Sequence, residues 1–343
     1  MHKSISPSRF EHELAAHVRH LVEQDAFSGV VLVARGDQTL FSAACGLAER
    51  NFGVPVTRET RFNLGSMNKM FTAVAIGRLV ARGDLSFDDT LDRFLSPDWL
   101  DPRWLAKIRI GHLLNHASGL GNYFDERFFA TSRDRYRSIE DYRPLIAVER
   151  PTFEPGTKNL YSNSGFMLAG AVIEAATGRS YFDFVRENVY QPAGMHDTDC
   201  YHVDAVTPNL AVGYTRRVDD GQALWESNLF KHVIRGGPAG GGFSTAADLL
   251  RFDRALRDER LLPRAILETL WTPRPVDGSY GYGFRIRRAP LGRVVGHAGI
   301  FPGISTRLDM HLDAGFTTIV LANIDHGAED VSDKIDGLLP HLD

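Results

Sequence analysis

The chain has 343 residues, of which 43% are hydrophobic and 24% are charged, proportions that are ordinary for a globular protein with a sizeable core. Its formal net charge is −4 and its arginines are interspersed with acidic residues, so we expect no nucleic acid partner. The apolar stretches are too short to span a bilayer and charges interrupt the N-terminal segment, so we expect no membrane segment and a cytoplasmic protein.

The first predicted elements are a helix over residues 9–25 and two strands within residues 27–46, joined by a turn near Gly36. A helix that is apolar on nearly every side follows over residues 66–82 and ends at Gly83, a residue suited to a left-handed cap. Because such a helix is buried on every side, we expect its polar first turn to open into a cleft.

The middle of the chain, from about residue 90 to about residue 260, is richer in helical patterns, and the tail returns to strands. Strands at both ends with helices between them predict an α/β (α+β) fold, in which one antiparallel sheet is built from both termini and flanked by helices. We expect a single domain over residues 1–343, with a sheet region (1–90 plus 265–343) and a mainly helical region (91–264). The predicted tail elements are strands over 280–289, 292–299, 304–314 and 316–323, and a helix near 328–340.

The stretch "SMNK" places Ser66 and Lys69 three residues apart at the start of a buried helix. Residues at this spacing share a helix face, so the lysine amine can reach the serine hydroxyl. Burial among apolar side chains lowers the pKa of a lysine, and a neutral amine can activate a serine as a nucleophile. The pattern alone is unspecific, because an N-cap serine followed by a solvated lysine gives the same four letters.

A second stretch, "TFEPGTKNLYSNSG", gives Tyr161 and Asn163 just before a predicted helix. A tyrosine hydroxyl beside a serine and lysine pair can relay a proton to a leaving group. An asparagine amide can orient the lysine and also bond a substrate carbonyl. In a third stretch, "VVGHAGIFPG", His297 and Gly299 end an apolar strand, and a free amide there could form an oxyanion hole with the amide of Ser66.

In this order the three stretches resemble the serine β-lactamase and penicillin-binding-protein family. The first matches Ser-x-x-Lys (Ser66, Lys69), the second Tyr-x-Asn (Tyr161, Asn163), and the third a strand motif that is usually Lys-Thr-Gly and is His-Ala-Gly at 297–299 here. The similarity covers nearly the whole chain. Its pattern is most similar to the class C-like branch, which includes D-aminopeptidases and carboxylesterases.

The resemblance implies acyl-enzyme chemistry without a metal or an organic cofactor. Ser66 attacks the substrate, Lys69 and Tyr161 handle protons, the backbone amides of Ser66 and Ile300 hold the oxyanion, and water then releases the acyl group. Which of Lys69 and Tyr161 is the base stays open, because their protons are coupled.

The third motif departs from the family pattern. A lysine there would supply a cation for a substrate carboxylate, whereas His297 is mostly neutral at pH 7, so we do not expect efficient β-lactamase activity. With Gly299 it resembles the version found in D-aminopeptidase-like members, and both residues are expected to bind substrate.

We therefore expect a serine hydrolase acting on small esters or amides, including D-amino acid derivatives, with a carboxylesterase as the alternative. Asn163 favours amide substrates because its side chain both donates and accepts hydrogen bonds. An apolar ester could enter the same cleft, whose mouth we expect to be lined by Tyr123, Phe124 or Phe301.

Two rival interpretations come from other classes. A zinc site could be suspected from His112 and His116, which lie one helical turn apart, but the glutamate of a metalloprotease motif is missing between them. A non-catalytic sensor or scaffold of the same fold is the second rival, although the chain keeps Ser66, Lys69 and Tyr161 together. The sequence does not indicate an oligomeric state.

Overall fold

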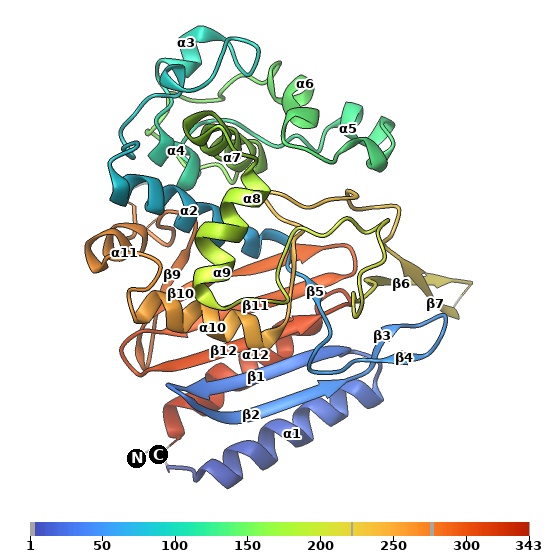
Figure 1. Ribbon diagram of the computed structural model, residues 1–343. Helices are drawn as coiled ribbons and strands as arrows, with labels where there is room; N and C mark the ends of the chain where they lie inside the picture. Colours follow the sequence, from blue (N-terminus) through green and yellow to red (C-terminus); the bar gives the residue numbers. More distant parts are fainter. Residues whose placement is uncertain (1–3, 221, 275–277, 343) are drawn as a thin grey trace.

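A computed structural model describes residues 4–220, 222–274 and 278–342 of the chain. It is built around a six-stranded antiparallel sheet in the order β2-β1-β12-β11-β10-β9 (Figure 1). The first two strands come from the N-terminal part of the chain and the other four from its C-terminal part, so the predicted sheet built from both ends is confirmed. The strands are β1 (Gly29–Arg35), β2 (Gln38–Cys45), β9 (Arg285–Ala289), β10 (Gly292–Phe301), β11 (Ile304–His311) and β12 (Phe316–Ala322).

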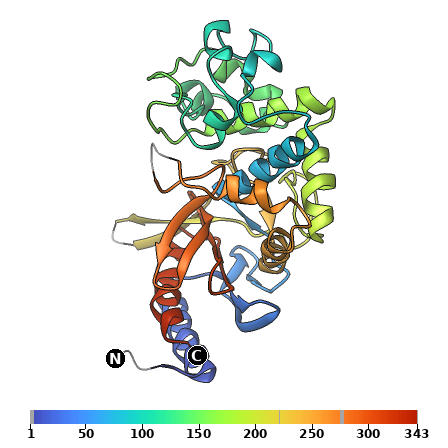
Figure 2. The ribbon, with the colours of Figure 1, turned by 90° about the vertical axis from the view of Figure 1, so that its left-hand side faces the viewer.

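The strand β1 is buried along almost its whole length because both faces of the sheet are covered. Successive side chains of a strand point to opposite faces. Val30 and Leu32 pack in the core that contains α2, whereas Val31 and Val33 pack in a second core with the helices α1 and α12. Figure 2 shows α1 and α12 side by side along the sheet. Continuous apolar strands are what burial on both faces requires.

Helices form most of the regular secondary structure between the two halves of the sheet (Figure 1). The helix predicted from Ser66 begins as a 3₁₀ turn and continues as α2, which ends at Gly83 in the left-handed conformation with φ of 79°. The α-helices are α1 (Pro7–Glu23), α2 (Asn68–Arg82), α3 (Pro102–Leu105), α4 (Ile110–Leu114), α5 (Glu126–Ala130), α6 (Arg143–Ile146), α7 (Asn163–Thr177), α8 (Tyr181–Val185), α9 (Gln191–Ala193), α10 (Ala246–Arg257), α11 (Arg264–Leu270) and α12 (Gly327–Leu338). The 3₁₀ turns are η1 (Gly65–Met67), η2 (Leu91–Arg93), η3 (Arg133–Arg135), η4 (Glu140–Tyr142) and η6 (Leu339–His341), and η5 (Arg186–Tyr190) is a π-helical turn.

Short strand pairs outside the main sheet were not predicted. The largest is the hairpin of β6 (Tyr214–Asp219) and β7 (Gln222–Ser227). Beyond Tyr214 the side chains of β6 are exposed or half-buried, so the hairpin lacks the hydrophobic alternation by which a strand is recognised in a sequence. The other pairs join β3 (Leu47–Glu49) to β4 (Val54–Pro55) and β5 (Phe62–Asn63) to β8 (Phe243–Ser244).

The strand predicted over residues 280–289 begins five residues later than expected. Gly283 has a φ of 75°, and the amide of Gly281 donates to the carbonyl of Phe284, so the chain turns before β9 begins. A Cβ at Gly283 would lie 2.4 Å from that of Ala73 on α2, so only glycine fits this turn. The turn brings Tyr280 against β10, where its hydroxyl reaches His297.

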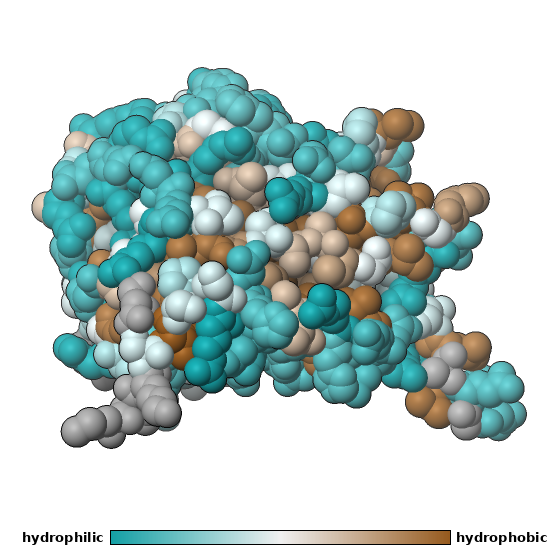
Figure 3. Space-filling view, turned by 90° about the horizontal axis from the view of Figure 1, so that it is seen from below, coloured by the Kyte–Doolittle hydropathy of each residue, from teal (hydrophilic) through white to brown (hydrophobic). Residues whose placement is uncertain are grey.

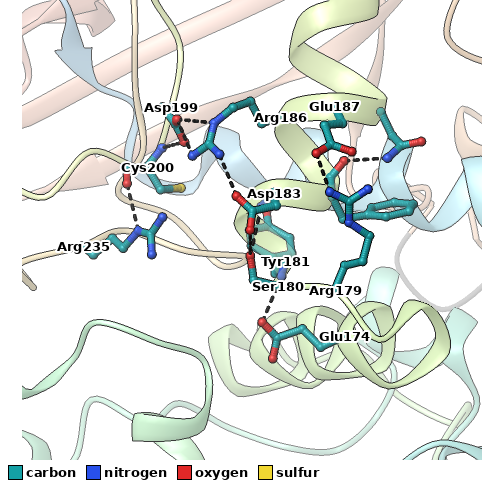
Figure 4. A network of polar contacts seen from close by, with 12 residues as sticks. Glu174, Arg179, Ser180, Tyr181, Asp183, Arg186, Glu187, Asp199, Cys200 and Arg235 are labelled. Atoms are coloured by element: carbon teal, nitrogen blue, oxygen red, sulfur yellow. Dashed lines mark hydrogen bonds and ion pairs between the residues drawn. The ribbon is translucent and has the colours of Figure 1, made fainter.

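A polar network fastens α8 and η5 to the loop that follows residue 198 (Figure 4). Arg186 forms ion pairs with Asp183 at 2.7 Å and with Asp199 at 2.8 Å. Arg235 donates to the backbone carbonyl of Cys200 at 3.1 Å. These contacts fix the start of the glycine-rich segment 235–242, which runs back toward α2.

The lower end of the molecule in Figure 1 carries the two chain ends close together. The amide of Ile5 donates to the carbonyl of His341 at 2.7 Å. Figure 3 shows this end with a mainly hydrophilic rim and more hydrophobic residues toward its middle. Within the part of the chain that the structure describes, no helix is both long enough and apolar enough to cross a membrane.

Candidate active site

Ser66 lies in the 3₁₀ turn η1, which packs against β10 and β11. Two glycines permit this contact. A Cβ at Gly65 would lie 3.2 Å from the amide nitrogen of Ile300, and a Cβ at Gly299 would lie 1.9 Å from the carbonyl oxygen of Leu64. The sequence predicts that Gly299 lets a substrate approach the backbone. In the structure the absence of a Cβ at Gly299 also allows the turn that carries Ser66 to pack closely against β10. The backbone at Ile300 therefore lies beside the peptide that precedes Ser66.

Lys69 is completely buried, and three acceptors surround its amine. Its Nζ lies 3.2 Å from Ser66 Oγ, 2.7 Å from Asn163 Oδ1 and 2.5 Å from the carbonyl oxygen of Ala239. Burial holds the pKa of Lys69 well below its usual 10.5, and the nearby charge of Arg285 lowers it further. A neutral amine could donate to Asn163 and Ala239 while it accepts from the serine hydroxyl, which is the arrangement that a base needs.

The segment that carries Ala239 is held in place by α2 and α8. Thr72, one turn after Lys69 on α2, donates to the carbonyl oxygen of Pro238 at 2.8 Å. Its hydroxyl also lies 2.8 Å from the hydroxyl of Tyr181. The third acceptor of the lysine therefore comes from a part of the chain that is 170 residues away in the sequence.

Tyr161 is 36% exposed, and the amine of Lys69 lies 4.8 Å from the centroid of its ring. Burial of its hydroxyl raises the pKa of Tyr161 to about 12, although a hydrogen bond with Ser66 and the charge of Arg285 act in the opposite direction. Its ring packs on the ring of His116, with centroids 4.3 Å apart. The tyrosine is therefore a neutral hydroxyl at pH 7, which can donate a proton.

Asn163 is the first residue of α7, a helix capped by Ser162, whose hydroxyl accepts from the amide of Gly165. Its Oδ1 accepts from Lys69, and its Nδ2 donates to Asn122 Oδ1 at 3.2 Å. The predicted orientation of the lysine by Asn163 matches this geometry. Asn122 was not predicted, because it lies in a loop whose sequence carries no motif.

His297 is buried on β10 with both ring nitrogens engaged. Nδ1 donates to the carbonyl oxygen of Ala298 at 2.6 Å, so Nε2 accepts from the hydroxyl of Tyr280 at 2.8 Å. Burial, together with the charge of Lys69, lowers the pKa of His297 to about 3. The imidazole is therefore neutral over the physiological range, as expected, and supplies no cation.

His116, the second histidine of the zinc interpretation, supports the tyrosine instead. Its Nδ1 accepts from the amide of Ser162 at 3.1 Å, and its ring also packs against Phe166 and Tyr280. The ring of His112 accepts at Nδ1 from the amide of Arg109. No group of three or more metal-binding side chains occurs within residues 4–220, 222–274 and 278–342.

Two hollows meet at Tyr161 and Ile300, which line both of them. The first, of about 290 Å³, contains Ser66 and Asn163 and is bordered by aromatic side chains. They include Tyr123, Phe124 and Phe301, which were predicted at the cleft mouth. The second, of about 590 Å³, has several charged side chains in its lining, contains His297 and is called the polar hollow below. Among the described residues, Gly299 lines neither hollow.

Arg285 is a residue of the second hollow that the sequence gave no reason to select. It is exposed at the start of β9, and no ion pair joins it to another side chain in the described ranges. It lines this hollow together with Tyr161, His116 and His297, and its charge acts to lower the pKa of these three groups and of Lys69. The strand next to the third motif thus carries a cation, although not at the position of the motif itself.

Comparison with known proteins shows the family. The profile of the β-lactamase family matches residues 14–341. The chain belongs to this family. It is 32% identical to penicillin-binding protein 4* of Bacillus subtilis over 327 residues, which are 90% of this chain and 71% of the relative.

An esterase and an amide hydrolase are also among the relatives. Esterase EstB of Burkholderia gladioli is 36% identical over 208 residues, which are 57% of this chain and 52% of the esterase. The solved structure of a D-stereospecific amidohydrolase from Streptomyces sp. superposes with a TM-score of 0.76 at 27% identity, covering 94% of this chain and 96% of that one. The match to a fold of mixed helices and antiparallel sheet agrees with the fold class predicted above.

Proposed function

We propose that the protein is a serine hydrolase that acts on small esters or amides through an acyl-enzyme on Ser66. The observation that carries this proposal is the buried amine of Lys69, held 3.2 Å from Ser66 Oγ by Asn163 and the carbonyl of Ala239. A solvated surface lysine would stay protonated at neutral pH and could not accept the serine proton. No ion pair with a carboxylate joins this amine among the described residues, and burying an amine without such a partner costs stability. An arrangement of this kind indicates a functional group.

In the acylation step, Ser66 Oγ forms a bond to the substrate carbonyl carbon while its proton passes to Lys69. The backbone amides of Ser66 and Ile300 stabilise the negative oxygen that develops. Tyr161 then donates its proton to the leaving group as the bond between carbonyl carbon and leaving group breaks. The lysine proton can replace the proton that the tyrosine has given up, so the site returns to its original charge.

In the second step, water attacks the acyl-enzyme and releases the carboxylic acid. The amine of Lys69 can accept the proton of this water and pass it to the serine oxygen as the bond between that oxygen and the acyl carbon breaks. Apart from the substrate and water, both steps use only groups of the chain.

Esters and amides are both retained as substrates because the relatives include an esterase and a D-stereospecific amidohydrolase. Efficient hydrolysis of penicillins is not part of the proposal, since neutral His297 replaces the cation of the third motif.

The test is intact-protein mass spectrometry after exposure to a fluorophosphonate and, separately, to a penicillin. We expect one fluorophosphonate adduct on the natural protein and none on Ser66→Ala, whereas the control Ser132→Ala, at an exposed serine, keeps the adduct. Turnover of p-nitrophenyl acyl esters or D-amino acid p-nitroanilides should be lost in the same variant. A natural protein without adduct and without turnover would overturn the proposal and favour a ligand-binding role.

A further inference from the structure

We infer that the first hollow, called the acyl pocket below, accepts an uncharged apolar acyl group and discriminates against acyl groups that carry an ammonium. This inference rests on the proposed function and names the substrate class for the same site. The proposed function does not distinguish between two kinds of substrate. One kind is an ester or amide of an uncharged carboxylic acid, and the other is an ester or amide of an amino acid with a free amino group.

The position of Ser66, which lines only the first of the two hollows, indicates which hollow holds which half of the substrate. The acyl carbon stays bonded to Ser66, and the acyl pocket contains Ser66, whereas the polar hollow does not. The leaving group departs toward its proton donor, Tyr161, and the polar hollow extends from this residue past His297. The acyl half of a substrate therefore occupies the pocket of about 290 Å³.

The acyl pocket is apolar and carries no charged side chain. Among the described residues that line it there is no aspartate, glutamate, lysine or arginine. Phe124 contacts Phe301 and Phe128, with ring centroids 5.8 Å and 5.0 Å apart, and forms one wall. Among these described residues the only histidine is His232, and burial lowers its pKa, which favours the neutral imidazole. Transfer of an apolar substituent from water into such a pocket is favourable.

An ammonium placed in this pocket would find no negative charge. The amide oxygen of Asn63 already accepts from the amide of Gly65, and that of Asn122 accepts from Asn163. The carboxylate of Glu149, behind the loop of Asn122, accepts from the amide of Gly121 and from a serine hydroxyl, and it does not line the pocket. A buried cation without a partner is strongly disfavoured.

Aromatic walls can attract cations, but one of these walls already has a cation stacked against it. The guanidinium of Arg133 lies 4.2 Å from the ring centroid of Phe128. The amine of Lys69 lies 3.2 Å from Ser66 Oγ, which lines the same pocket. A further cation in the pocket would be repelled by both groups when the lysine is protonated, and by the arginine in every state.

The test compares three esters: p-nitrophenyl 3-phenylpropanoate and the p-nitrophenyl esters of D- and of L-phenylalanine, which add an ammonium to the same acyl skeleton. Assays at about pH 6 keep the amino group protonated. We expect kcat/KM for the phenylpropanoate to exceed that of either amino acid ester by at least about tenfold. An equal or higher kcat/KM for one of the amino acid esters would overturn the inference.

A charge introduced into the wall should change this ratio. In Phe124→Asp the new carboxylate offers the ammonium a partner, so the ratio should fall toward one, whereas the neutral control Phe124→Leu should keep it above about fivefold. Phe301→Asp provides a second position if the first variant does not fold. A matched change at the exposed Phe52, which is 87% exposed and outside the pocket, should leave the ratio as in the natural protein.

The outcomes also separate this inference from the function on which it rests. Turnover of both kinds of ester without preference would contradict the inference and leave the hydrolase proposal intact. Absence of turnover on all of these esters, together with absence of a fluorophosphonate adduct, would overturn both. A ratio that stays unchanged in Phe124→Asp and in Phe301→Asp would contradict the assignment of the acyl half to this pocket.

Discussion

The acyl pocket and the polar hollow share Tyr161 and Ile300 but differ in charge. The acyl pocket has aromatic walls without a charged side chain, whereas the polar hollow is lined by Arg285 and by an ion-pair cluster. In that cluster Arg287 and Arg307 both bind Asp309. In the proposed assignment the reacting bond lies between the two hollows. The site would then recognise the two halves of a substrate by different physical means, apolar burial for the acyl half and charge for the leaving half.

The largest effect is expected where the two hollows meet. Tyr161→Phe removes the hydroxyl and keeps the ring that packs on His116, so the fold should persist while kcat/KM falls by about 10²–10⁴-fold, the usual contribution of a proton donor. The loss should be greater for a poor leaving group than for p-nitrophenolate, which needs little help from an acid. Steady-state assays with phenyl and p-nitrophenyl esters measure it, and an equal loss for both would contradict the role as acid.

A smaller change should affect the acyl pocket alone. Phe301→Ala removes one apolar wall of the acyl pocket. We expect the ratio of kcat/KM for p-nitrophenyl hexanoate to kcat/KM for p-nitrophenyl acetate to fall by about 10- to 100-fold, which corresponds to the free energy of burying one large apolar side chain. Phe230→Ala, at an aromatic residue that is 91% exposed, is the matched control and should leave the preference unchanged. If both esters lose activity equally, the pocket does not bind the acyl chain.

The polar hollow should respond more weakly because Arg285 is exposed to solvent. In Arg285→Ala we expect kcat/KM for an ester with a carboxylated phenol as leaving group to fall about two- to fivefold, the range of an exposed ion pair. The corresponding ester of the uncharged phenol should be unaffected. Because screening weakens exposed charges, the difference should shrink in high salt, and a difference that salt does not alter would contradict an electrostatic cause.

The smallest effect concerns the pH at which the amine loses its proton. With Lys69 as base, kcat/KM should rise with pH along a limb whose midpoint lies below 10.5, because only the neutral amine accepts the serine proton. A Tyr161 phenolate as base would instead place the midpoint near 12. In Arg285→Ala the pKa of Lys69 should rise, since a repelling cation is gone, and the limb should move to higher pH by less than about one unit.

A downward shift of this limb in Arg285→Ala, or none, would show that the charge of Arg285 does not act on the base. The midpoint belongs to the coupled lysine and tyrosine, so the same profile in Tyr161→Phe is the control that isolates the lysine.

Much of the fold was predictable because its strands are apolar on a regular pattern. The strand pair within residues 27–46 and the strands β10 to β12 lie where their patterns place them. The hairpin β6–β7 was missed because the side chains of β6 after Tyr214 are exposed or half-buried, and β9 starts late because of a turn at Gly283, where α2 leaves room only for glycine. Local patterns cannot report either cause, since both lie in contacts between distant segments.

The site was partly predictable for a similar reason. Ser66 and Lys69 share one helix face, so their contact follows from spacing alone. Asn163 could be paired with the lysine only through the family resemblance, and the carbonyl of Ala239 and the amide of Asn122 carry no sequence signal at all. Arg285 is one arginine among many until the fold brings β9 beside the site.

The sequence by itself determined the elements and the reactive groups of this protein, because periodicity and side-chain chemistry are local properties. Only the tertiary structure decided the direction in which the pKa values of Lys69 and His297 shift, and the difference in charge between the two hollows. Burial of Lys69 and His297 depends on side chains from remote segments, and the removal of water that lowers their pKa values exists only once those segments have packed together.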